Sequence, residues 1–166
     1  MAHEEQLIFF DYDQSRAQGV LEEKLKDYKG YLQFDGYAGY KQFKENDDIH
    51  WLCCMAHARR KFEAALDIDH KRATSVLVKM QRLYRLEHWM RVFQIDNEGK
   101  LKLRCRVTVP ILDELKKYLD ENEKKVAPSE PIAKAIAYTL NLWEELIRYT
   151  SDGRLHIDNN LIENKI

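Results

Sequence analysis

Two acidic residues stand where carboxylates can do chemistry. Asp35 directly follows an apolar run at residues 31–34, and Glu163 closely follows a polar run at residues 158–160. A carboxylate at the end of a buried strand is costly to desolvate unless it has a partner or a cation. Hard divalent cations prefer oxygen ligands. We therefore interpret the two acids as candidate ligands of a shared metal ion.

Each of these positions also has an ordinary structural explanation. Asp35 precedes a glycine, and Asp-Gly is a common turn sequence. Glu163 early in a helix would favour the helix dipole, and Asp158 or Asn159 would cap the start of that helix. Taken singly, none of these signals is specific for a metal site.

A cationic segment separates the two acids in the chain. Residues 54–62 (CMAHARRKF) place a thiol, an imidazole and three cations at the end of an apolar run, and Cys53 stands directly before them. One interpretation is a patch that contacts phosphates, and the other is the solvated face of a helix. The predicted patch consists of His57, Arg59, Arg60 and Lys61.

The two thiols suggest a further alternative, which is metal binding by Cys53, Cys54 and His57. Adjacent strand residues point to opposite faces, so the two sulfur atoms cannot both serve one ion. No second Cys/His pair lies nearby to complete a tetrahedral set. The spacing therefore disfavours this site.

The composition limits which classes of protein this chain can belong to. The chain has 166 residues, 45% of them hydrophobic, which suits one domain with a core. Its net charge is only -1, so contact with nucleic acid would need a local patch. Three cysteines, two of them adjacent, argue against a disulfide framework and favour a reducing cytoplasm. We find no signal peptide and no long apolar run, so we expect neither export nor a membrane span.

The apolar pattern predicts an α/β layer followed by helices. We expect strands at residues 7–12, 31–34 and 49–55, separated by a helix after Ser15 and a short one near residues 40–43. Strands that alternate with helices pair in parallel. The helices expected next cover residues 56–66 and 71–93, the latter ended by residues 96–99, then one opened by Pro110 and one between the linker 127–131 and residue 152.

Four segments together resemble one protein family. They are residues 30–40 (GYLQFDGYAGY), 54–62 (CMAHARRKF), 83–87 (LYRLE) and 157–164 (IDNNLIEN). Each is modest alone, but in this order they resemble the catalytic region of the insertion-sequence-66 family of bacterial transposases. The resemblance runs over nearly the whole chain.

The resemblance implies a fold and an activity. The fold is an α/β, ribonuclease-H-like core, here incomplete because only strands three to five are present, with an all-helical insertion at residues 56–152. The activity is DNA cleavage and strand transfer by a DDE triad, in which Asp35 matches the second Asp and Glu163 the Glu. Mg²⁺ or Mn²⁺ held by the acids would serve the chemistry. The implied partners are transposon-end and target DNA, in the bacterial cytoplasm at the nucleoid.

The first acid of the triad departs from the family pattern. Asp11 lies on a predicted strand, but that strand leads into a helix and so occupies the place of the third strand. We therefore expect the first Asp to lie before Met1, and we expect residues 1–166 to form a single truncated catalytic domain that is inactive alone. Without its native neighbours, the strand at 7–12 would shift beside the Asp35 strand or pair with another copy of the chain.

Two alternative functions remain open. The first is an active metal-dependent nuclease that uses Asp11, Asp35 and Glu163. The second is a non-catalytic helical module whose partner surface includes Trp89 and Trp143, although aromatic stripes at helical spacing belong more commonly to a core.

Overall fold

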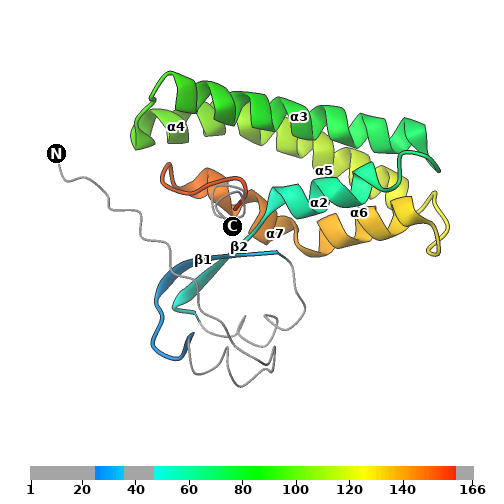
Figure 1. Cartoon of the computed structure of the whole chain (residues 1–166), viewed down its shortest axis with the longest axis horizontal. Coiled ribbons are helices and arrows are strands. Elements are labelled where there is room, and N and C mark those ends of the chain that lie inside the picture. Colours follow the sequence, from blue (N-terminus) through cyan, green and yellow to red (C-terminus); the bar gives the residue numbers. More distant parts are fainter. Residues whose placement is uncertain (1–24, 36–46, 160–166) are drawn as a thin grey trace.

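A computed structural model describes residues 25–35 and 47–159 of the chain (Figure 1). Strands β1 (Gly30–Phe34) and β2 (Ile49–Cys53) form a two-stranded parallel sheet, in register from the Gly30–Ile49 pair to the Phe34–Cys53 pair. This confirms the predicted parallel pairing. The predicted strand at 7–12, including Asp11, and the predicted helix near 40–43 lie outside the described residues.

The second strand is buried on both faces, as its nearly continuous apolar sequence predicts. In β2 only His50 is exposed, whereas Trp51 and Leu52 are buried although they point to opposite faces. The Phe34 ring meets the Trp51 ring edge-on, with centroids 5.6 Å apart. The strand ends at Cys53, two residues earlier than predicted, because Met55 already begins the first helix of the helical part.

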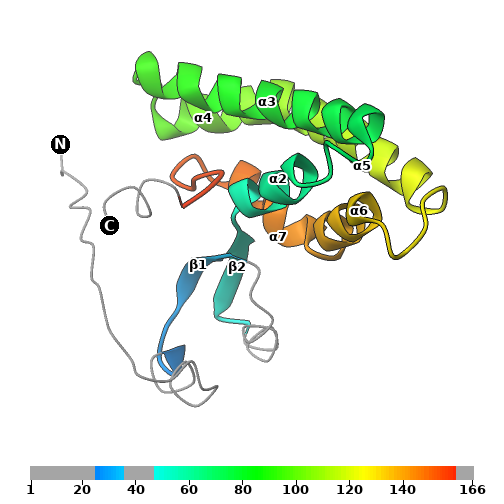
Figure 2. The same cartoon turned by 45° about the vertical axis from the view of Figure 1, so that its right-hand side comes forward.

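The rest of the described chain is helical. The elements in order are α2 (Met55–Glu63), α3 (His70–Val92), α4 (Asn97–Leu103), a π-helical turn (Arg104–Thr108), α5 (Val109–Glu123), α6 (Pro131–Asn141), α7 (Trp143–Ile147) and a 3-10 turn (Arg148–Ser151). Figures 1 and 2 show α3 and α5 side by side in an outer layer, with α2, α6 and α7 between that layer and the sheet. No helix in the described ranges is long and apolar enough to cross a membrane.

The core lies between these helices and extends to the sheet. The fully buried side chains recur at helical spacing, as expected for faces that pack inward. They include Phe62, Val76, Met80, Leu83, Leu115, Leu119, Ile132, Ile136 and Leu146. Trp143 is also buried and belongs to this core, whereas Trp89 is 64% exposed and stacks on Phe93.

Two expectations about these helices are wrong. Residues 96–99 do not end the long helix; Asp96 instead caps α4, because its carboxylate accepts a hydrogen bond from the Gly99 N–H at 2.8 Å. Pro110 does stand at the start of α5, as predicted, although α4, the π-helical turn and α5 follow one another without a break. A proline ring clashes with the carbonyl four residues earlier, and the wider π-helical turn just before α5 relieves this clash. The predicted last helix is broken at Leu142, whose φ of -116° is not helical.

Candidate metal and DNA-binding site

Asp35 lies immediately after β1, at the edge where both strands end, and it is exposed. Its backbone carbonyl accepts a hydrogen bond of 2.9 Å from the hydroxyl of Tyr138 on α6. The Tyr138 ring in turn carries the Lys61 ammonium 4.4 Å from its centroid. The helical part of the chain therefore holds the backbone at Asp35 and places a cation on the ring of the residue that holds it.

The segment that precedes Glu163 docks at the same edge. The Ile157 carbonyl accepts a hydrogen bond of 3.1 Å from the backbone N–H of Met55, just past the end of β2. The Gln33 side chain donates to the His156 carbonyl at 3.1 Å. The fold thus brings residues 156–157 to the strand that ends at Asp35. Glu163 itself lies outside the described residues.

Asp158 and Asn159 follow in this segment and are half-buried. Burial, and then the nearby Asp158 carboxylate, raise the pKa of the Tyr84 hydroxyl. The Asn159 side-chain oxygen is buried and has no hydrogen-bond partner within residues 25–35 and 47–159. The helix that these residues were expected to cap lies outside the described residues, so the capping prediction stays a prediction.

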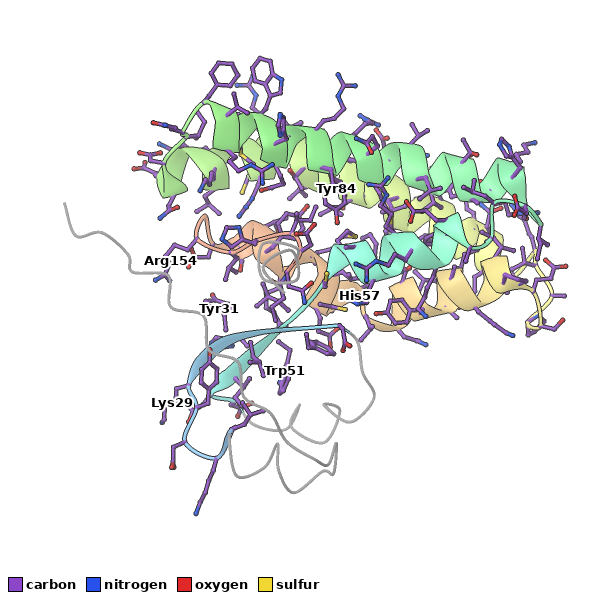
Figure 3. The ribbon with its side chains drawn as sticks, viewed as in Figure 1. Lys29, Tyr31, Trp51, His57, Tyr84 and Arg154 are labelled. Carbon is purple, nitrogen blue, oxygen red and sulfur yellow. The ribbon has the colours of Figure 1, made fainter. Side chains whose placement is uncertain are left out.

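The predicted basic patch is divided between two sides of α2. Arg59 and Arg60 line a cavity between α2 and α3, and Arg60 contacts the His57 ring at 3.2 Å. Lys61 lies instead over the ring of Tyr138, the residue whose hydroxyl donates to the Asp35 carbonyl. Figure 3 shows His57 near the start of α2 and Tyr84 on the side of α3 that faces α2. The four residues therefore serve two neighbouring surfaces rather than one.

A buried arginine that the sequence reasoning missed fixes the approach to this segment. Arg104 is 1% exposed, and its guanidinium donates two hydrogen bonds, of 2.9 and 2.8 Å, to the Glu87 carboxylate. It also donates to the backbone carbonyls of Tyr149, Asp152 and Leu155, at 2.7 to 2.9 Å. One side chain thereby ties α3 to the chain that leads into residues 156–159. Glu87 belongs to the LYRLE segment, and this segment was the one sign in the sequence of the Arg104–Glu87 pair.

A close backbone contact also holds the chain before residue 156, here against α4. Gly153 is buried, and a Cβ atom there would collide with the backbone of Asn97 at the start of α4. The chain can therefore pass this close to α4 only with glycine at this position.

The two adjacent cysteines are poor metal ligands. Both are buried, and burial raises the pKa of the Cys53 thiol to about 12 and also raises the pKa of Cys54. A thiol must lose its proton to bind a metal. Within the described ranges, no three His, Cys, Asp or Glu side chains come together as a metal site.

This burial predicts a clear difference in thiol reactivity. With dithiobis-nitrobenzoate at about pH 8, we expect exposed Cys105 to react at least about 100-fold faster than the buried Cys53 and Cys54. The reagent attacks only a deprotonated thiol that it can reach. The release of thionitrobenzoate measures each phase. Cys105→Ser should abolish the fast phase, and a fast phase that survives this change would contradict the described burial.

The donors at the strand edge fit an oxygen-preferring cation. They are the exposed Asp35 carboxylate and the buried Asn159 amide oxygen, whereas the neighbouring sulfurs are protonated. Mg²⁺ and Mn²⁺ select such oxygen donors over thiols. The chemistry of these side chains is therefore suited to one of these ions.

Comparison with known proteins establishes the family. The family model described as "Transposase IS66 family" matches residues 1–166, so this chain belongs to the IS66 transposase family. This confirms the resemblance drawn from the four sequence segments.

Three relatives from Sinorhizobium fredii are each described as an uncharacterized protein. The chain is 29% identical to y4jD in an alignment 164 positions long that covers 94% of this chain and 32% of that protein. It is 29% identical to y4qI in an alignment 168 positions long, gaps included, that covers 96% of this chain and 31% of that protein. It is 28% identical to y4hP in an alignment 156 positions long that covers 84% of this chain and 28% of that protein. The chain thus spans about a third of the length of these relatives. No solved structure matches it.

Proposed function

We propose that this chain is a catalytic region of a DDE-type DNA transposase, in which Asp35 and Glu163 hold Mg²⁺ or Mn²⁺. One observation carries the proposal: the segment that precedes Glu163 docks where β1 and β2 end. Gln33 on β1 donates to the His156 carbonyl, and the backbone N–H of Met55, just after β2, donates to the Ile157 carbonyl. Membership of the family supports the same assignment. The reaction is hydrolysis of a DNA phosphodiester, followed by transfer of the freed 3'-hydroxyl to target DNA.

The chain's own residues would divide this work. Asp35, held through its carbonyl by Tyr138, would present its carboxylate beside the scissile phosphate. Lys61 would supply positive charge toward the same phosphate. The bound ions would activate the attacking oxygen and stabilise the leaving oxygen.

We propose that the two described strands correspond to the fourth and fifth strands of a ribonuclease-H-like core. Their parallel pairing and the position of Asp35 directly after β1 support this. Residues 56–152 are then the helical insertion, and residues 1–166 belong to one catalytic domain. Within it, the insertion would steady the site through Tyr138 and Arg104.

The triad requires three acids, and within the ranges that the structure describes no three His, Cys, Asp or Glu side chains come together. That this chain alone performs no strand transfer stays a prediction. The alternative nuclease would use Asp11, which lies outside the described residues. The family function also implies action in the bacterial cytoplasm at the nucleoid, and self-association stays a prediction.

Binding to DNA tests the proposal at α2. We expect Arg60→Gln/Lys61→Gln to weaken binding of a labelled transposon-end duplex about 10-fold at about 0.1 M salt. The slope of log affinity against log salt concentration should also become shallower, by the amount expected for the loss of about two phosphate contacts. Fluorescence anisotropy over a salt series measures both. The control is Lys124→Gln/Lys125→Gln, which removes the same charge from exposed residues after α5. Equal losses in the two variants would contradict a specific role for α2.

A further inference from the structure

A cavity of about 670 Å³ lies between α2, α3, α4 and residues 155–158. We propose that this cavity binds an unpaired strand of DNA, with its phosphates on Arg60, Arg91 and Lys100 and a base against the apolar part of the lining. The proposal rests on the transposase function and assigns a surface beyond the acids and the Asp35 side of α2.

The charge of the lining favours a polyanion. The lining holds five arginine or lysine side chains and three acidic ones, although the whole chain has a net charge of -1. Two of the acids are already engaged, Glu63 with Arg59 at 2.9 Å and Glu87 with Arg104 at 2.8 Å. The net positive charge of this cavity therefore contrasts with the balanced charge of the chain as a whole.

Two of the cations are not committed to carboxylates. Arg91 donates to the Nδ1 atom of His88 at 3.2 Å, and in the described part of the chain no carboxylate lies within ion-pair distance of Arg91 or Lys100. Burial, and then Lys100 and Arg104, lower the pKa of His156 on the opposite wall.

The lining of the cavity also contains apolar side chains and an aromatic ring. Tyr84, Ile95 and Leu155 are among its lining residues. A duplex presents phosphates on its outside and keeps its bases stacked within, whereas an unpaired strand offers a base face and a phosphate together. A hollow whose lining combines cations with aromatic and aliphatic side chains therefore suits an unpaired strand.

The cavity and the Asp35 edge share one wall. Residues 155–158 line the cavity, and within them the His156 carbonyl accepts the hydrogen bond from Gln33, two residues before Asp35. A strand that leaves the proposed cleavage position can thus continue over this segment into the cavity.

Anisotropy with a labelled single-stranded oligonucleotide in EDTA tests the proposal without any metal. We expect Arg91→Gln/Lys100→Gln to weaken binding at least about 10-fold at about 0.1 M salt. Lys124→Gln/Lys125→Gln should change it less than about 2-fold. Circular dichroism of each variant shows that the fold is retained. A second variant, Ile95→Gln, removes apolar surface from the lining without a change of charge, and it should also weaken the binding of the single strand.

The outcomes separate two failures. If the unchanged chain binds neither single-stranded nor duplex DNA, the transposase proposal itself fails. If it binds DNA but the cavity pair and the control pair behave alike, only the cavity assignment is overturned. A loss that is equal for duplex, single strand and heparin would mark a general polyanion surface and would also overturn the unpaired-strand claim.

Discussion

Replacing Arg104 with methionine should lower the free energy of unfolding by about 3–5 kcal/mol. The change would leave the Glu87 carboxylate, whose side chain is only 16% exposed, without its bidentate partner. It would also remove the donor to three backbone carbonyls that hold the chain before residue 156. Urea denaturation followed by circular dichroism measures the loss.

Two comparisons make this prediction specific. Arg82 pairs with Glu114 at 3.0 Å, but these side chains are 48% and 55% exposed, so Arg82→Met should cost less than about 1 kcal/mol. Arg104→Met combined with Glu87→Leu should recover part of the loss, because no buried charge is then left unpaired. A cost for Arg104→Met no larger than that for Arg82→Met would show that the buried pair does not hold the fold together.

Asp35→Asn should weaken the binding of Mn²⁺ at least about 10-fold, because a charged oxygen ligand is replaced by a neutral amide. Isothermal titration calorimetry measures the affinity. Asp47→Asn is the matched control: Asp47 is an exposed acid that precedes β2, at the opposite end of the sheet, and its replacement should leave the affinity unchanged. Equal affinities in the two variants would remove Asp35 from the metal site.

The sequence predicted the elements whose signal is local. The apolar runs around Leu32 and Trp51 predicted two parallel strands, and regular spacing of apolar residues predicted α3 within one residue of its observed ends. Residues 96–99 were misassigned because an Asp followed by a Gly can end one helix or begin the next. Only the Asp96 hydrogen bond distinguishes the two cases.

The site was predictable only in part. The position of Asp35 directly after a strand was recognisable, because a strand end leaves marks in a short stretch of sequence. Tyr138 and Arg104 were not, because their partners are far away in the chain: Tyr138 reaches back 103 residues to Asp35, and Arg104 bonds carbonyls 45 to 51 residues ahead. Contacts of this length depend on the packing of helices, which no local pattern encodes.

The central claim is that Asp35 and Glu163 bind one ion at the edge where β1 and β2 end. Nuclear magnetic resonance of the labelled chain with traces of Mn²⁺ tests it directly, because the ion broadens the signals of amides close to it. The claim predicts that the amides of Phe34, Asp35 and residues 157–159 broaden first, and that Asp35→Asn or Glu163→Gln removes the effect. Broadening that centres on Asp47, or that survives both substitutions, would contradict it.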